Sequence, residues 1–177
     1  MHNQVSARVV INLPREIAWE KLQDLTRAHD YVPGVIKTEI TTANTTGVGA
    51  SRRVYQSDSK SLDETVVEWQ EGHGFLLRLH RGARGAPPPF AEAQFRYRID
   101  DAGNGQTSLT TTLIYTPAMG LFGRLLDKWL LNKAMRGTIR DVALAMKAYY
   151  ESGEPTTPER IKQLKAALRE QNRNAAQ

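Results

Sequence analysis

The sequence predicts an α+β domain in which one antiparallel β-sheet packs against a long C-terminal helix. The N-terminal part contains a strand-like segment followed by a helical one. Six strand-like segments then follow one another between residues 35 and 117, separated by short turns. From Met119 onward the apolar residues recur with a helical period. Parallel strands would need crossover helices that these short turns cannot supply, so the six strands are predicted to be antiparallel.

The chain begins with one predicted strand and two short predicted helices. Residues 5–12 alternate and carry β-branched side chains, which is typical of a strand. Pro14 suits the first turn of the helix that follows. Three apolar residues fall on one side of this helix: Ile17, Leu22 and Leu25. The Pro33-Gly34 pair then ends a second short helical piece.

The six central strands are predicted at residues 35–42, 49–56, 61–70, 74–82, 90–100 and 106–116. The clearest of them is 90–100, in which apolar and polar residues alternate. Its apolar face carries Ala91, Ala93, Phe95, Tyr97 and Ile99. This alternation indicates a sheet with one covered face and one face in water.

The C-terminal third is predicted to be helical. The segment that starts at Met119 runs for about 32 residues, or roughly 48 Å at the helical rise, which is long enough to cross the sheet. Gly153 and Pro155 end it. A short amphipathic helix follows, with apolar residues at Ile161, Leu164 and Leu168. We therefore expect a domain over residues 1–152 and a helical tail over 153–177.

Composition limits the possible classes of protein. The chain of 177 residues contains no cysteine, which excludes disulfides and thiolate metal sites and is compatible with a cytoplasmic protein. The N-terminus does not resemble a secretory signal, and no apolar run is long enough to cross a bilayer. The net charge of +5 lies entirely in residues 119–177. A solvated helix face explains this charge, and attraction to an anionic membrane surface is the alternative. No nucleic-acid-binding motif is present, so we expect no nucleic-acid partner.

Several stretches in this order carry a family resemblance: INLPREIAWEKLQDL, YVPGVIKTEI, GVGASRRV, LDETVVEW and YTPAMGLFGRLLDKWL. Over about residues 5–152 the chain resembles the START-like superfamily, also called SRPBCC or Bet v 1-like, and most of all its polyketide cyclase/dehydrase and lipid-transport branch. The resemblance implies a helix-grip fold, in which a curved seven-stranded antiparallel sheet wraps around the long C-terminal helix. It also implies a cavity between them for a hydrophobic small molecule such as a lipid, quinone or polyketide.

Within such a cavity, apolar and aromatic side chains would contact the ligand. On the predicted strand and helix faces these are Phe75, Leu77, Phe95, Tyr97, Leu113, Tyr115 and Trp129. Buried phenols usually find a hydrogen-bond partner, so the two tyrosines could orient a ligand carbonyl. Ordinary core packing is the alternative for all of these residues.

Glu64 corresponds to a position where relatives often carry an inward glutamate, and its direction depends on the strand register. With Gln70 opposite Phe75, Glu64 would point inward and lie opposite Arg81, which would make a polar anchor for a ligand. A slip of one residue would pack Val67 and Trp69 inward and would turn Glu64 outward. Burial of apolar side chains favours the second register and the resemblance favours the first.

The segment RGARGAPPPF (81–90) interrupts the strands with three prolines. Proline cannot donate to a ladder, so this segment is predicted to stay outside the sheet as a semi-rigid lip over the cavity. The lip would comprise Arg84, Pro87, Pro88 and Pro89, together with Met119 and Phe122 from the next connection at that end. The alternative is a solvated loop that only joins two strands.

No catalytic constellation is recognisable. The four histidines lack metal-ligand spacing, and we expect neither a metal nor a cofactor. His80 lies beside Arg81, and a surface role suits it better than a catalytic one. The sequence thus predicts a carrier or binder of a hydrophobic molecule. Two alternatives stay open: a polyketide cyclase, aromatase or dehydratase that acts by positioning its substrate, and an interaction protein that docks through its basic C-terminal helix.

Overall fold

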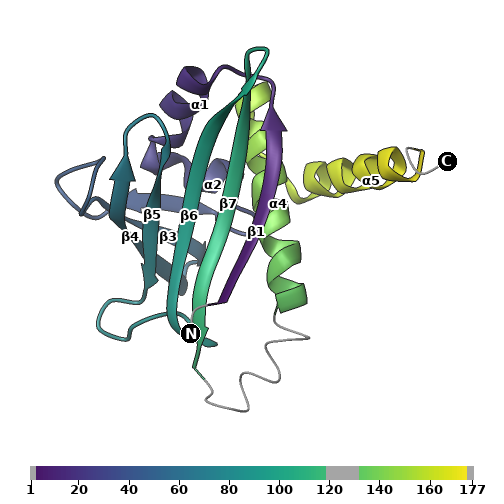
Figure 1. The fold of residues 1–177 in the computed structure, drawn as a ribbon. Coiled ribbons are helices and arrows are strands. Elements are labelled where there is room, and N and C mark those ends of the chain that lie inside the picture. The colour runs from purple at the N-terminus through teal and green to yellow at the C-terminus, as the bar shows by residue number, and fades with distance from the viewer. Residues whose placement is uncertain (1–2, 119–131, 175–177) are drawn as a thin grey trace.

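The computed structural model describes residues 3–118 and 132–174 (Figure 1). Its strands are β1 (Asn3–Ile11), β2 (Lys37–Ile40), β3 (Ser51–Ser57), β4 (Lys60–Gln70), β5 (Gly74–His80), β6 (Phe90–Gly103) and β7 (Gln106–Pro117). Its helices are α1 (Arg15–Leu22), α2 (Ala28–Tyr31), α4 (Asn132–Ser152) and α5 (Pro158–Asn174), with a 3₁₀ turn at Leu25–Arg27 before α2.

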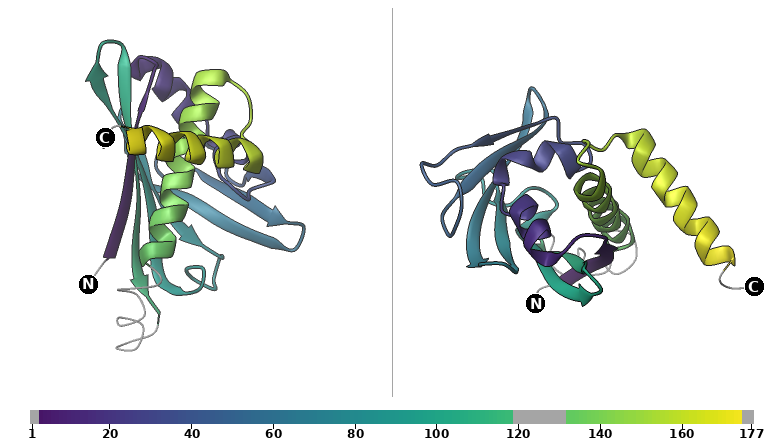
Figure 2. Two further views of the ribbon diagram at one scale, coloured as in Figure 1. Left: turned by 90° about the vertical axis from the view of Figure 1, so that its right-hand side faces the viewer. Right: turned by 90° about the horizontal axis from the view of Figure 1, so that it is seen from above.

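The seven strands form one antiparallel sheet in the order β1-β7-β6-β5-β4-β3-β2. Strands β2 to β7 are therefore neighbours in sequence order, as predicted, and β1 joins the sheet beside β7. The sheet curves around α4, which lies across its concave side, while α1 and α2 close one end (Figure 2). The predicted α+β helix-grip architecture is confirmed.

The long C-terminal helix supplies one wall of the core. Its sheet-facing side carries Ile139, Val142, Met146, Tyr149 and Tyr150, all buried. These residues pack in one hydrophobic cluster with the inward side chains of the strands. The first part of the predicted helix, with Leu121, Leu125 and Trp129, lies outside the described residues.

Helix α1 differs from its prediction in the face that it buries. Ile17 is 40% exposed, whereas Ala18, Trp19 and Leu22 are buried. The reason is the indole of Trp19, which packs edge-on against Trp69 of β4 at 5.1 Å and donates from Nε1 to Glu71 at 2.9 Å. Because Trp19 turns toward the sheet, Ile17 is carried to the outer side of this two-turn helix.

The tail forms the predicted amphipathic helix α5, which projects away from the domain (Figures 1 and 2). Its N-terminal end is attached by Thr156, whose backbone N–H and hydroxyl both donate to the carbonyl oxygen of Asp30 at 2.8 and 3.0 Å. Ile161 is buried, and Lys165 pairs with Asp141 of α4 at 2.8 Å. No described helix has the length and apolar character needed to span a membrane.

Candidate functional site

The β4–β5 hairpin adopts neither of the two registers considered above. At its closed end Gln70 lies opposite Gly74 and Trp69 opposite Phe75. A β-bulge between Val66 and Glu68 then shifts the pairing, so that Val66 lies opposite Leu77 and Glu64 opposite Leu79. An extra residue in one strand reverses the facing of everything beyond it. Trp69 and Glu64 therefore both point inward, which neither unbroken register allows.

Glu64 points inward, but its partner is Arg52 of β3 and not Arg81. The Nε atom of Arg52 lies 2.6 Å from Oε2 of Glu64, and the two side chains are 0% and 12% exposed. Arg81 instead donates from Nη2 to the carbonyl oxygen of Ala86, at 3.4 Å, within its own loop. The predicted pair between Glu64 and Arg81 is wrong for two reasons: Gln70 lies opposite Gly74 rather than Phe75, and the bulge adds a further shift that places Leu79 opposite Glu64.

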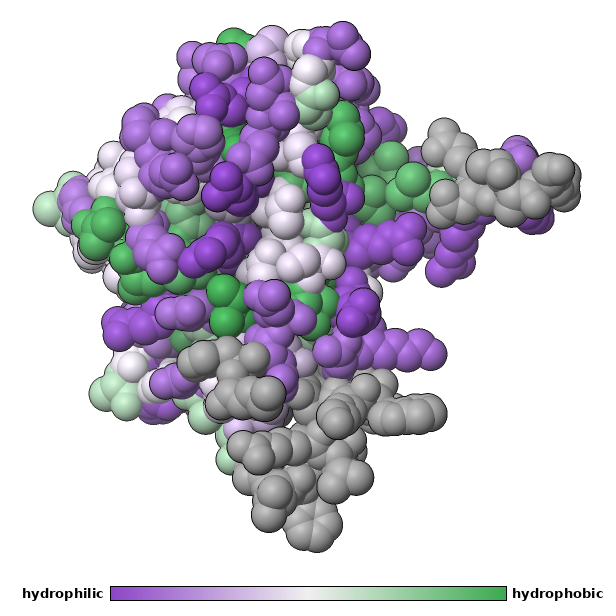
Figure 3. Space-filling view, viewed as in Figure 1, coloured by the Kyte–Doolittle hydropathy of each residue, from purple (hydrophilic) through white to green (hydrophobic). Residues whose placement is uncertain are grey.

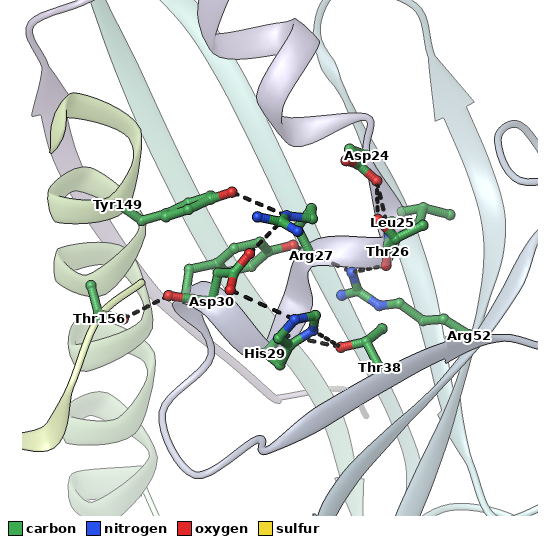
Figure 4. A network of polar contacts seen from close by, with 11 residues as sticks. Asp24, Leu25, Thr26, Arg27, His29, Asp30, Thr38, Arg52, Tyr149 and Thr156 are labelled. Carbon is green, nitrogen blue, oxygen red and sulfur yellow. Dashed lines mark hydrogen bonds and ion pairs between the residues drawn. The ribbon is translucent and has the colours of Figure 1, made fainter. Parts of the chain in front are cut away.

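Arg52 reaches from β3 under the turn that precedes α2 (Figure 4). Its Nη1 donates to the carbonyl oxygen of Leu25 at 3.2 Å and to the hydroxyl of Tyr31 at 3.3 Å. Its Nη2 is buried and has no partner among the described residues. Burial is the largest single influence and lowers the pKa of Arg52, but the charge of Glu64 and the contributions of Tyr31 and Tyr97 together outweigh it, so the pKa is raised and the guanidinium stays charged.

Three tyrosines from different elements surround this cation: Tyr31 of α2, Tyr97 of β6 and Tyr150 of α4. All are at most 3% exposed. Burial raises the pKa of each phenol, and the charge of Arg52 opposes that rise only in part. The phenols are therefore neutral at physiological pH and able to donate. The Tyr150 hydroxyl is buried and has no partner among the described residues.

A network of polar contacts holds α2, and with it Tyr31, in place (Figure 4). Arg27 pairs with Asp30 at 2.8 Å and donates from Nε to the hydroxyl of Tyr149 of α4 at 3.4 Å. The backbone N–H of His29 donates to the hydroxyl of Thr38 in β2 at 3.0 Å. These contacts connect α2 to both the sheet and α4, so the position of the Tyr31 phenol is fixed from two sides.

The predicted cavity-lining residues lie on the inward face of the sheet. Six of them are buried: Phe75, Leu77, Phe95, Tyr97, Leu113 and Tyr115. Trp129, Met119 and Phe122 lie outside the described residues. The cavity between the sheet and α4 stays a prediction. A role for these side chains in ligand binding likewise stays a prediction.

The lip (residues 81–90) folds back on itself next to the end of β7. The backbone N–H of Arg81 donates to the carbonyl oxygen of Gly85 at 2.7 Å, and that of Ala118 donates to Pro89 at 2.9 Å. Arg84, Pro88 and Pro89 are exposed, and Pro87 is half-buried. Beside the lip, β5 and β6 separate beyond Arg78 and Gln94. A pocket of about 480 Å³ lies there, lined by residues that include Leu79, His80, Gly82, Gly85, Ala86 and Ala93.

His80 belongs to this pocket and not to the Arg52 cluster. Its Nδ1 accepts from the backbone N–H of Gly82 at 3.2 Å, so its Nε2 carries the proton donated to Thr65 Oγ1 at 2.8 Å. Burial, and then the charge of Arg78, lower the pKa of His80. The ring is thus neutral near pH 7, and both of its nitrogens are engaged.

Neither Arg52 nor Tyr31 was predicted from the sequence as a site residue. The available signal was strand parity, since Ala50, Arg52 and Val54 alternate on one face and both flanking residues are apolar and buried. A charged residue between two inward apolar positions must itself point inward, and it then requires a partner.

The comparisons agree with this architecture. Residues 2–151 match the family model described as polyketide cyclase / dehydrase and lipid transport. A START superfamily protein from Mycobacterium smegmatis has a TM-score of 0.64 at 17% identity, covering 85% of this chain and 98% of that one. An aromatase/cyclase from Streptomyces sp. R1128 has a TM-score of 0.59 at 16% identity, covering 85% and 94%.

A third similar structure is norcoclaurine synthase from Thalictrum flavum, with a TM-score of 0.62 at 13% identity, covering 84% of this chain and 86% of that one. A comparison with curated protein sequences gives no match. At these identities the structural likeness establishes the fold, while the family model spans nearly all of the sheet and α4. The chain therefore belongs to the polyketide cyclase/dehydrase and lipid-transport family.

Proposed function

We propose that the chain binds a hydrophobic small molecule between the sheet and α4, and that Arg52 anchors a hydrogen-bond acceptor of this ligand. The observation that carries the proposal is a pair of buried groups with no partner among the described residues: Nη2 of Arg52 and the hydroxyl of Tyr150. Leaving such groups unpaired costs free energy, so they are expected where a ligand completes the site.

The surroundings of Arg52 define the chemistry of the ligand. The Nε and Nη1 atoms of Arg52 already bind Glu64, Leu25 and Tyr31, so Nη2 is left to donate to a ligand. The phenols of Tyr97 and Tyr150 are neutral and are also able to donate. An oxygen acceptor, such as a carbonyl, enol or carboxyl group, suits this set of donors. Most other inward side chains are apolar or aromatic, and the hydroxyl of inward Thr111 already donates to the carbonyl oxygen of Ile139, so the rest of the ligand is hydrophobic.

The first test is to identify what the protein carries. The full chain is purified, examined by native mass spectrometry, and extracted with organic solvent. It is then titrated with a panel of fatty acids, quinones and aromatic polyketides. We expect a hydrophobic, oxygen-bearing molecule in the extract or a panel member that binds. Protein without a bound molecule, together with no binding across the panel, would overturn the proposal.

The second test separates the anchor from general packing. Tyr150→Phe removes only the unpartnered hydroxyl, so stability is expected to stay unchanged or to rise slightly. Affinity for the ligand found above is expected to fall roughly 2- to 10-fold, the loss of one hydrogen bond. Tyr55→Phe is the matched control, because the Tyr55 hydroxyl donates to Glu39 between β3 and β2, outside the cluster. Equal affinities for Tyr150→Phe and the unaltered chain would exclude Tyr150 from the anchor.

A cyclase or aromatase activity is the second candidate. A buried cation next to neutral phenols is suited to stabilise the negative charge that develops on an enolate oxygen. The similarity to an aromatase/cyclase structure supports this candidate at the level of the fold. Incubation of the chain with a linear polyketone, followed by mass spectrometry, should then give a cyclised or dehydrated product. The product should disappear with Arg52→Gln/Glu64→Gln, a change that leaves no unpaired charge. A product that persists in this variant would contradict a catalytic role for Arg52.

A further inference from the structure

A groove lies outside the domain. Helix α5 forms one wall of it, and the edge strand β1 together with α4 forms the other. The volume of the groove is about 570 Å³. Apolar residues from all three elements line it: Val9, Val10, Leu144, Ala148, Leu164, Ala167 and Leu168. Figure 3 shows apolar side chains gathered where α5 leaves the domain, surrounded by hydrophilic ones. This groove lies on the opposite side of α4 from the interior site, so it is a separate feature.

Helix α5 forms one wall of the groove without closing onto the other. Ile161, near its attached end, is buried, whereas Leu164 and Leu168 are only half-buried and Val10 on the facing strand is 41% exposed. The helix diverges from α4 toward its C-terminal end (Figure 2). Two apolar walls thus face each other without meeting, and Leu164 and Leu168 have the i, i+4 spacing that suits contact with a partner helix.

The rim of the groove is basic. Arg8, Arg140, Lys147 and Arg160 line it together with a single acid, Glu151. Glu151 is already paired with Lys147 at 2.6 Å. Arg140 and Arg160 are exposed and form no ion pair within the described part of the chain. The rim therefore carries an uncompensated positive charge above an apolar floor.

We propose that this groove binds an amphipathic helix of a partner protein, with apolar anchors on one side and acidic residues flanking them. Charge complementarity selects an acidic segment. A second copy of α5 is disfavoured, because residues 158–174 contain five Lys/Arg and two Asp/Glu and would repel the rim. A flat bilayer is disfavoured as well. Leu164 and Leu168 face into the groove, on the side of α5 that is turned toward the domain, where a flat surface does not reach them.

The test uses a display library of 18-residue helical peptides selected against the full chain. We expect enriched peptides to have apolar residues at i, i+3 or i+4 spacing and a net negative charge. Their affinity, measured by fluorescence polarisation, should fall at least 10-fold with Leu164→Glu/Leu168→Glu and with Arg140→Glu/Arg160→Glu. Circular dichroism establishes that each variant is folded; if the leucine variant is not, Val10→Glu on the other wall takes its place.

Lys162→Glu/Arg169→Glu is the matched control. It makes the same change in the net charge of the chain as Arg140→Glu/Arg160→Glu, but Lys162 and Arg169 line the opposite side of α5. The proposal predicts an affinity that stays within about 2-fold of the unaltered chain. It is overturned by enrichment of neutral or basic peptides, by no enrichment, or by equal losses in the two charge variants. Binding to phosphatidylglycerol vesicles that requires Leu164 and Leu168 would also overturn it in favour of a membrane surface.

Discussion

The Arg52 guanidinium and the Glu64 carboxylate, 2.6 Å apart, form an ion pair in which the Arg52 side chain is fully buried. The next residue, Arg53, pairs with Asp63 at 2.7 Å, but its side chain is 43% exposed. Removing one partner of a buried pair leaves an uncompensated charge, whereas an exposed pair contributes little. We expect Arg52→Met to lower the free energy of unfolding by about 3–5 kcal/mol and Arg53→Met by less than about 1 kcal/mol.

Urea unfolding at pH 7 measures both values. The double variant Arg52→Met/Glu64→Leu removes both charges together, and it should recover much of the loss seen with Arg52→Met alone. Similar losses of unfolding free energy for Arg52→Met and Arg53→Met would contradict a buried, coupled pair. So would a loss in the double variant equal to the sum of the losses in Arg52→Met and Glu64→Leu measured separately.

A second prediction concerns Gly74, which starts β5 directly against the backbone of β6. Its φ is +148°, and a Cβ atom placed there would lie 2.1 Å from the carbonyl oxygen of Tyr97. Because the obstacle is backbone, β5 and β6 would have to move apart. We expect Gly74→Ala to destabilise the protein by at least about 3 kcal/mol, at the upper end for a single substitution.

Gly72→Ala is the control for Gly74→Ala. Gly72 has a φ of +72°, but nothing lies within 4 Å of a Cβ atom there. Only the conformational cost remains, about 1–2 kcal/mol. Thermal unfolding of the two variants should therefore give clearly different midpoints. Equal midpoints would mean that a Cβ atom at position 74 does not clash with the carbonyl oxygen of Tyr97.

The topology was predictable because it depends on features that repeat along the chain. Alternation in residues 90–100 and short turns between strands are enough to specify an antiparallel meander, and the structure confirms each strand to within a few residues. The direction of Glu64 was not predictable, because it depends on a single bulge between Val66 and Glu68. That bulge lets Trp69 and Val66 both face the core, which no unbroken strand permits.

The buried cluster was only partly predictable for a related reason. The inward position of Arg52 follows from parity in β3, but its partners come from β4, α2 and the turn before it. Contacts between segments this far apart in sequence depend on how the sheet curves, and local periodicity carries no information about that. The mistaken pairing of Glu64 with Arg81 arose in the same way, from reasoning about one hairpin alone.

A third prediction concerns acid stability. Glu71 accepts hydrogen bonds from Nε1 of Trp69 at 2.8 Å and of Trp19 at 2.9 Å. The bond from Trp69, and then that from Trp19, lower the pKa of Glu71 below its ordinary value of 4.5. A lowered pKa stabilises the folded state above the unfolded pKa, and this stabilisation disappears as the pH falls through the folded pKa. Unfolding followed by tryptophan fluorescence from pH 7 to pH 3 should therefore show a loss of stability below about pH 4.5.

Glu71→Gln keeps an oxygen acceptor but does not titrate, so this part of the loss should be absent from that variant. Glu20→Gln, on the exposed side of α1, is the control and should retain the pH dependence of the unaltered chain. If Glu71→Gln and the unaltered chain lose stability in parallel below pH 4.5, the two tryptophan hydrogen bonds do not account for the effect.

The last prediction concerns the division into a domain and a tail. Truncation after Gly153 removes α5, the two hydrogen bonds from Thr156 to Asp30, and the buried side chain of Ile161. These contacts are few compared with the core that joins the sheet to α4. We therefore expect the truncated chain to fold, with a free energy of unfolding lower by about 2–4 kcal/mol. Its amide spectrum should keep the dispersed signals of the sheet, and Tyr150→Phe should still weaken ligand binding in it. A truncated chain without cooperative thermal unfolding would show that α5 is an integral part of the domain.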